Sequence, residues 1–321
     1  MSGRVRGVAL AFLVFLLGTP ASAQDYPTRP IHFVVGFAAG GPNDIVARIL
    51  GEWLSKHMGQ QWVIENRAGS GGMLAAGAVL ASPPDGYTLM FVAPNNAIGA
   101  SLYKKLPFNF IRDSAPVAGT LQLANLMVVP PSLPVNSVAE FIAYARANPG
   151  KLNFASSGNG TSVHMSGELF KLMAGIDIVH VPYRGSAAAY PDLMSGKVHV
   201  LFDNLPGSIG FARAGQLKAL GVTTAKRWDS TPEIPAISET VKDYEASVWY
   251  GISAPKGTPP AIIDKLNKAV NAALADPALV KRFGELGAVT MPLTPEEFGK
   301  LVADETEKWR KVVEFAGVSV D

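Results

Sequence analysis

A glycine-rich loop near the start of the chain combines residue types and spacing that favour anion binding. Residues 31–37 form an apolar run that predicts a buried strand. Residues 38–42 must turn, because glycine and proline interrupt strands. Asn43 or Asp44 would then cap a helix whose apolar residues recur at helical spacing. The free N–H groups and the positive end of the helix dipole would meet at one spot, although an ordinary turn between strand and helix is the simpler interpretation of this loop alone.

The same arrangement recurs later in the chain. Residues 152–155 predict a strand, residues 156–160 form a small polar loop with two glycines, and Thr161 or Ser162 is placed to cap a helix that runs to Ala174. Further strands are predicted to end in loops at Asn95, at Tyr183 to Ser186, and at Asp203. Ligands of open α/β sheets bind beyond the carboxyl ends of strands. We therefore expect the two anion-ready loops to face each other across a cleft.

Sequence motifs of enzymes and of metal sites are absent or incomplete in this chain. The five histidines show no HxxxH spacing, and without cysteine we expect no structural zinc site. No GxSxG is present, and residues 101–104 match SxxK without its partner motifs. Residues 158–160 begin a GxG but lack the third glycine of a dinucleotide site. We expect no catalysis, no cofactor and no metal.

The first 23 residues have the three parts of a secretory signal peptide. Arg4 and Arg6 precede an apolar run at residues 8–17, and Ala21-Ser22-Ala23 fits the cleavage rule. The run is too short to span a bilayer comfortably, and without cysteine the mature N-terminus cannot be lipidated. We expect cleavage after Ala23 and, in a bacterium with two membranes, a soluble periplasmic protein.

The composition limits the kinds of molecule that this protein is expected to bind. The leader carries two of the 28 Lys and Arg residues and none of the 26 Asp and Glu residues, so the mature chain is neutral at pH 7. A neutral chain without basic blocks argues against nucleic acid or an anionic membrane as the main partner. With 17% charged and 48% hydrophobic residues, the chain is expected to form compact α/β cores.

Two proline-rich connectors divide the mature chain. They lie at residues 130–134 and 254–260 and bracket a central block of alternating strands and helices. This pattern predicts a discontinuous domain 1, residues 24–127 and 251–321, with domain 2, residues 128–250, inserted into it. Only helices are expected after the second connector, and Thr294 with Glu297 predicts a capping box for the final one. Two domains around a cleft suit a hinged binding protein.

Four segments carry a resemblance to a known family. They are residues 36–50 (GFAAGGPNDIVARIL), 65–91 (ENRAGSGGMLAAGAVLASPPDGYTLMF), 154–170 (FASSGNGTSVHMSGELF) and 181–206 (VPYRGSAAAYPDLMSGKVHVLFDNLP). In this order the set resembles the tripartite tricarboxylate transporter receptors, the Bug-type extracytoplasmic solute receptors. Gly36 stands where the family commonly has proline, and Asn43 where serine or threonine is frequent.

The resemblance implies a periplasmic-binding-protein type II (Venus-flytrap) fold of two α/β domains and no catalysis. It implies a small organic carboxylate as ligand, held mainly by main-chain amides and small polar side chains. A monomer that delivers this ligand to integral-membrane permease subunits is expected; a sensing subunit for a two-component sensor kinase is the alternative.

By position, the resemblance also implies the ligand-binding residues. They are Ala39, Gly40, Gly41, Pro42, Asn43, Asp44, Asn95, Ser157, Gly160, Thr161, His164, Tyr183, Arg184, Gly185, Ser186 and Asp203.

Five of these side chains have two interpretations each. Asp44 caps the helix or selects an ammonium or hydroxyl group. Asp203 contacts the ligand or holds loop N–H groups, and His164 contacts it or packs in the core. Arg184 pairs with a carboxylate or is solvated, and Tyr183 stacks on an aromatic ligand or forms a wall of the cleft.

Overall fold

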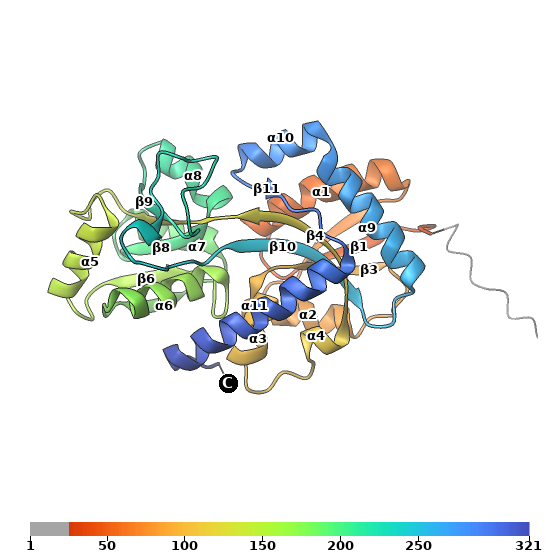
Figure 1. Cartoon of the computed structure of the whole chain (residues 1–321), viewed down its shortest axis with the longest axis horizontal. Coiled ribbons are helices and arrows are strands. Elements are labelled where there is room, and N and C mark those ends of the chain that lie inside the picture. The colour runs from red at the N-terminus through yellow and green to blue at the C-terminus, as the bar shows by residue number, and fades with distance from the viewer. Residues whose placement is uncertain (1–25, 321) are drawn as a thin grey trace, which may run out of the picture.

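The computed structural model describes residues 26–320, which form two α/β lobes, each built on its own mixed sheet (Figure 1). The predicted signal peptide, residues 1–23, lies outside the described residues. The first sheet has the order β11-β4-β10-β3-β1-β2, and the second has the order β7-β6-β8-β5-β9. The strands of the first sheet are β1 (Ile31–Val35), β2 (Trp62–Asn66), β3 (Thr88–Val92), β4 (Ser114–Leu123), β10 (Val248–Pro255) and β11 (Val289–Thr290). Those of the second are β5 (Asn125–Val129), β6 (Asn153–Ser156), β7 (Val179–Pro182), β8 (Val200–Asn204) and β9 (Lys218–Val222).

Helices cover both faces of each sheet. In the first lobe they are α1 (Pro42–Met58), α2 (Met73–Leu80), α3 (Pro94–Leu102), α4 (Phe110–Asp113), α9 (Pro260–Ala275), α10 (Pro277–Glu285) and α11 (Pro295–Ala316), with a 3₁₀ turn at Ser70–Gly72. In the second lobe they are α5 (Val138–Ala147), α6 (Ser162–Ala174), α7 (Ser186–Met194) and α8 (Leu205–Arg213), with a 3₁₀ turn at Ile237–Glu239.

Strand β1 shows why the sequences of the central strands are largely apolar. Phe33 and Val35 pack into the core beneath α1, α9 and α10, whereas Val34 packs into the core beneath α2 and α11. Successive side chains of a strand point to opposite faces, so a strand buried on both faces needs apolar residues throughout.

Three sequence predictions about these elements are wrong. Helix α1 has Gly41 as its N-cap residue, without a side-chain cap, so neither Asn43 nor Asp44 caps it. Strand β4 was not predicted, and β11 contradicts the expectation of helices only after the second connector. The capping box of α11 is confirmed, because the Thr294 hydroxyl accepts from the Glu297 amide at 3.2 Å and Glu297 accepts from the Thr294 amide at 2.9 Å.

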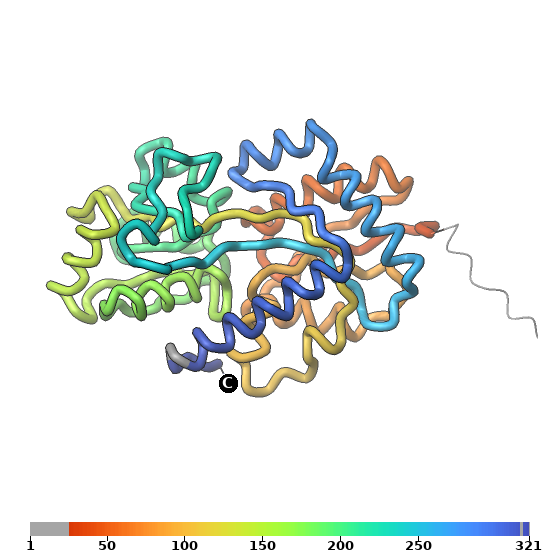
Figure 2. The backbone as a smooth tube through the Cα atoms, in the orientation of Figure 1, coloured from red at the N-terminus to blue at the C-terminus, as the bar shows by residue number. Residues whose placement is uncertain are grey.

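The chain passes between the lobes along two neighbouring paths (Figure 2). It leaves the first sheet with β4, crosses at Ala124, and enters the second sheet with β5. It returns through the loop after β9 and re-enters the first sheet with β10, which pairs antiparallel with β4. The chain therefore changes sheet once at Ala124 and once between β9 and β10.

Helix α11 joins the two cores (Figure 1). Its first half contributes Phe298 to the core of the first lobe, and its second half contributes the fully buried Trp309 to the core of the second. Between them, the Glu305 carboxylate accepts a hydrogen bond from the indole N–H of Trp249 at 3.0 Å and another from that of Trp309 at 2.8 Å. The lobes therefore share one continuous helix as well as two strand crossings.

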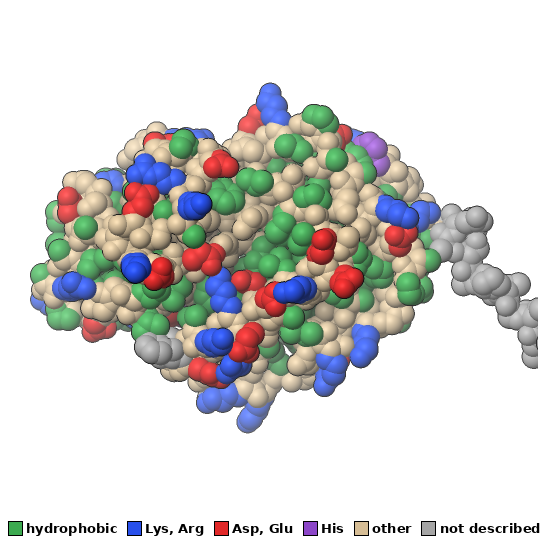
Figure 3. Space-filling model, in the orientation of Figure 1, with side chains coloured by type: hydrophobic (Ala, Val, Ile, Leu, Met, Phe, Trp, Pro, Cys, Tyr) green, Lys and Arg blue, Asp and Glu red, His purple; other side chains and the backbone are tan. Residues whose placement is uncertain are grey.

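The surface carries mixed charge. Acidic and basic side chains are interspersed on the face shown in Figure 3. Within residues 26–320, none of the helices has the length and apolar character needed to cross a membrane. The same residues contain no cluster of His, Cys, Asp and Glu side chains that could hold a metal ion.

Candidate functional site

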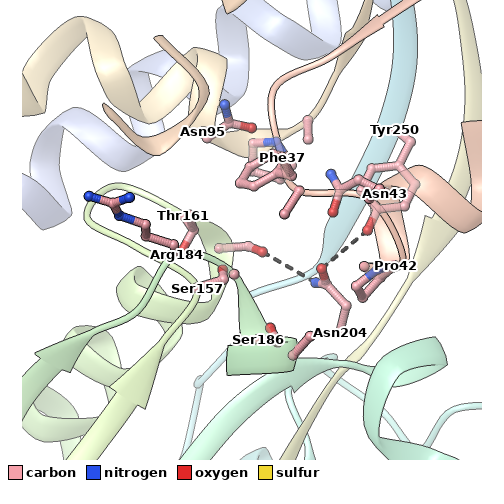
Figure 4. A pocket seen from close by; sticks show the side chains of 18 residues that line it. Phe37, Pro42, Asn43, Asn95, Ser157, Thr161, Arg184, Ser186, Asn204 and Tyr250 are labelled. Atoms are coloured by element: carbon pink, nitrogen blue, oxygen red, sulfur yellow. Dashed lines mark hydrogen bonds between the residues drawn. The ribbon is translucent and has the colours of Figure 1, made fainter. Parts of the chain in front are cut away.

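A cavity lies between the lobes, next to the strand crossings (Figure 4). The space not filled by protein atoms is about 530 Å³, and this figure includes the part that is open to solvent. Residues of the first lobe that line it are Phe37, Ala38, Ala39, Gly41, Pro42, Asn43, Ala93, Pro94, Asn95 and Tyr250. Those of the second lobe are Ser157, Thr161, Ser162, Arg184, Gly185, Ser186, Ala187 and Asn204.

Four helices begin at this cavity: α1 and α3 from the first lobe, and α6 and α7 from the second. Helices α1 and α7 start after Gly41 and Gly185, and neither has a side-chain cap. Their first N–H groups therefore have no partner within the helix. Of the described residues that line the cavity, Arg184 is the one charged side chain. Helix dipoles, open N–H groups and one guanidinium together favour an anion.

The loop of the first lobe is held in shape by Asp44. This buried carboxylate does not line the cavity. It accepts hydrogen bonds from the Gly40 amide at 2.8 Å, from Arg48 at 2.9 Å and from the Asn66 side chain at 2.9 Å. Burial alone would raise the pKa of Asp44, but these hydrogen bonds outweigh it and lower the pKa below its ordinary value. An ionised Asp44 thus fixes the turn that presents Gly41 and Asn43.

The loop of the second lobe rests on two histidines, the buried His164 and the half-buried His180. Nδ1 of His164 accepts from the Gly160 amide at 3.2 Å, and Nε2 of His180 lies 2.6 Å from the Ser156 hydroxyl. Their rings stack with centroids 4.0 Å apart. Burial lowers the pKa of His180 to about 3, so this ring is neutral at pH 7. His164 therefore supports the loop from behind and does not line the cavity.

Asp203 also lies behind the cavity wall. It is fully buried and accepts hydrogen bonds from the hydroxyls of Ser186 and Tyr190. Burial raises its pKa to about 6. Since Ser186 gives its only hydroxyl proton to Asp203, that hydroxyl can act towards a ligand as an acceptor.

A series of side-chain hydrogen bonds connects the two lobes at the back of the cavity (Figure 4). The hydroxyl of Tyr250, in β10, donates to Oδ1 of Asn204 at 3.2 Å. The Asn204 amide group then donates to Asn125 Oδ1 at 2.6 Å and to the Ser162 hydroxyl at 3.4 Å. Both lobes are thereby linked at the cavity by neutral, buried hydrogen bonds.

Ten of the sixteen residues predicted from sequence line the cavity: Ala39, Gly41, Pro42, Asn43, Asn95, Ser157, Thr161, Arg184, Gly185 and Ser186. The other six do not: Gly40, Asp44, Gly160, His164, Tyr183 and Asp203. Gly40 donates to Asp44, and Gly160 lies against Leu102 of the other lobe. The Tyr183 hydroxyl donates to Asp192 at 2.9 Å, and Tyr183 lines a neighbouring groove.

Eight lining residues were missed: Phe37, Ala38, Ala93, Pro94, Ser162, Ala187, Asn204 and Tyr250. Asn204 follows Asp203 directly, and side chains alternate along a strand, so one of the two had to point away from the cavity. The sequence gives no means of choosing between them. Tyr250 lies inside an apolar strand, where an aromatic residue reads as core.

Residues 46–318 match the family model described as "Tripartite tricarboxylate transporter family receptor". The chain belongs to this family. This confirms the family predicted from sequence. The members of this family are binding proteins and not enzymes, again as predicted.

Solved structures agree with this assignment. The chain is 40% identical to R. palustris Rpa4515, solved with adipate, with a TM-score of 0.89 over 92% of this chain and 99% of that one. It is 32% identical to the periplasmic binding protein BugD, with a TM-score of 0.87 over 92% and 99% of the two chains. MatC from Rhodopseudomonas palustris, solved with bound malate, is 31% identical, with a TM-score of 0.85 over 90% and 100%. The predicted periplasmic-binding-protein fold with two α/β domains is confirmed.

Proposed function

We propose that this solute-binding protein captures a small organic dicarboxylate in the cavity between its lobes and closes over it by hinge motion. The observation that carries the proposal is the meeting of four helix N-termini at a cavity whose described lining holds one cation and no carboxylate. One carboxylate of the ligand would accept hydrogen bonds from the N–H groups of Asn43 and Asp44 in the first lobe and from those that follow Gly185 in the second, because Pro42 has no N–H. Two similar proteins were solved with adipate and malate, which belong to this ligand class.

Contacts between the lobes support closure as part of binding. A Cβ atom on Gly71 would lie 2.3 Å from the carbonyl oxygen of Asn159, and one on Gly160 would lie 2.5 Å from Leu102 Cδ2. Both glycines let backbone of one lobe lie directly against the other lobe. Closing these contacts excludes water from the cavity, which strengthens each bond between an amide and a carboxylate.

Isothermal titration of the mature protein tests the ligand class. The protein is first unfolded and refolded to remove bound ligand, then titrated with adipate, malate and acetate. We expect saturable one-to-one binding of at least one dicarboxylate and none of acetate at the same concentrations. Absence of binding by malate and by linear dicarboxylates of every length from C4 to C12 would refute the proposed ligand class.

A matched pair of variants tests the cavity. Ala187 lines it in the first turn of α7 and is exposed, so a longer side chain can be accommodated there without loss of the fold. Glu at this position would repel a carboxylate, by about 3 kcal/mol for charges about 5 Å apart at an effective dielectric constant of about 20. Ala187→Glu should weaken binding at least about tenfold. Ala187→Gln, of the same size without the charge, should weaken it much less; equal losses would exclude electrostatic repulsion as the cause.

We further propose that the protein acts in the periplasm and delivers its ligand to a tripartite tricarboxylate-type permease. The family assignment and the predicted leader, residues 1–23, support this. The exported protein should begin at Gln24 by N-terminal sequencing. Vesicles that carry the permease subunits should take up labelled dicarboxylate when the loaded protein is added, and uptake without the protein would contradict a delivery role.

A further inference from the structure

A second, larger space adjoins the cavity. The space not filled by protein atoms is about 1890 Å³ in this outer groove and about 530 Å³ in the inner cavity, and both figures include space that is open to solvent. The two spaces share wall residues, among them Phe37, Ser157 and Arg184. The two spaces meet at these residues, so a ligand that extends from the inner cavity into the groove would pass between them.

One side of the outer groove is apolar. Met73, Leu74 and Phe108 line it from the first lobe. Leu74 is 59% exposed, the largest exposed fraction among the exposed large hydrophobic side chains of the described residues. An apolar chain lying along this side would remove Leu74 from water, and burial of apolar surface contributes roughly 25 cal/mol per Å².

The charged side chains of the groove all have one sign. Lys105 of the first lobe and Arg184 of the second line it, and no Asp or Glu is found in its described lining. Both cations are exposed, and among residues 26–320 neither has an ion-pair partner. The groove thus combines an apolar side with two unpaired cations, which is complementary to an apolar chain that ends in an anion.

We propose that the outer groove binds the distal half of an elongated dicarboxylate whose proximal carboxylate occupies the inner cavity. The preferred ligand is then an α,ω-dicarboxylate longer than adipate, with its far carboxylate near Lys105 and Arg184. This inference rests on the proposed function, because it needs the inner cavity to hold the first carboxylate. Since both lobes line the groove, a long ligand contributes to closure from both sides.

The test is a titration series with linear C4 to C12 α,ω-dicarboxylates and the monocarboxylates of the same chain lengths. We expect the best diacid longer than C6 to bind at least about tenfold more tightly than adipate, which corresponds to about 1.4 kcal/mol. The monocarboxylate of that length should lose most of this gain, because it lacks the distal charge. Affinity that falls steadily beyond C6 would overturn the inference.

Lys105→Gln separates the two sites, because Lys105 lines the groove and not the inner cavity. It should weaken the long diacid about fivefold or more and leave adipate unchanged. Lys242→Gln is the control: Lys242 is also exposed and lies outside both linings. Equal effects of Lys105→Gln on adipate and on the long diacid would overturn the inference.

A second matched pair places charge in the groove itself. Ala78 is exposed on α2 and lines the groove, and Glu and Gln are both good helix formers. Ala78→Glu should abolish the preference for long diacids while adipate binding persists, and Ala78→Gln should retain the preference. If adipate binds but the chain length of the diacid has no effect on affinity, this inference fails while the proposed function stands. If no dicarboxylate of any length binds, the proposed function fails and the inference fails with it.

Discussion

Asp203→Asn should change the pH dependence of stability by an amount that follows from burial. Burial raises the pKa of Asp203 from 3.8 to about 6, so between these values the folded protein keeps a proton that the unfolded chain has released. The stabilisation from this proton is fully present below pH 3.8 and is lost as pH rises through 6. At 1.36 kcal/mol per unit, the loss is about 3 kcal/mol.

The variant cannot titrate at this position and so lacks this dependence. Asn keeps the shape, and the hydroxyls of Ser186 and Tyr190 can rotate to pair with its amide. The measurement is urea unfolding of the ligand-free protein and the variant from pH 3.5 to 7.5. Groups that titrate alike in both cancel in the difference. The free energy of unfolding of the natural protein minus that of Asp203→Asn should fall by about 3 kcal/mol over this range.

Asp192→Asn serves as a control of opposite sign. A hydrogen bond from Lys197 lowers the pKa of Asp192, so the natural protein should gain stability relative to this variant as pH rises. A difference for Asp203→Asn that stays constant within about 0.5 kcal/mol, or that rises with pH, would refute the reasoning about its burial.

Three further substitutions test closure, the shared helix and the chain of polar groups. Gly160→Val should prevent closure, because its φ of 75° disfavours a branched residue and the added Cβ would overlap Leu102; affinity should fall at least about tenfold in a protein whose circular dichroism is unchanged. Unchanged affinity would remove this contact from closure. Trp309→Ala should lower the free energy of unfolding by about 3–5 kcal/mol in urea, since it empties a fully buried site, and a loss below about 1 kcal/mol would show that α11 adds little to the core of the second lobe. Tyr250→Phe leaves Asn204 Oδ1 without its donor and should cost about 1–3 kcal/mol of stability; full stability with altered ligand affinity would instead assign the hydroxyl to ligand binding.

The elements with a clear hydrophobic period were predictable from the sequence, and β4 shows where this signal ends. It contains Pro116 and Gly119, residues that normally argue against a strand. In the fold, Pro116 sits at a register irregularity opposite Ser253 of β10, and Gly119 leaves space where a Cβ would lie 2.8 Å from Leu293. Both features depend on partners more than a hundred residues away, so no local pattern could show them.

The site was predictable at its loops and much less so behind them. Glycine, hydroxyl and amide residues after predicted strands correctly indicated the positions of Gly41, Ser157 and Ser186 in the lining. A charged residue at the end of a predicted strand looks the same in the sequence whether its side chain lines the cavity or supports the cavity wall from behind. Asp44 holds the loop before α1 and Asp203 holds the first turns of α7, both through hydrogen bonds, and only the geometry distinguishes this support from lining the cavity.

The helix shared by both lobes has a consequence for the order in which the chain folds. Residues 295–316 follow every strand of both sheets in sequence, yet they supply Phe298 to one core and Trp309 to the other. A ribosome makes the chain from its N-terminus, so neither core can be completed before this helix has been synthesised. The two lobes therefore reach their final stability together and late, and a chain interrupted before residue 295 leaves both unfinished.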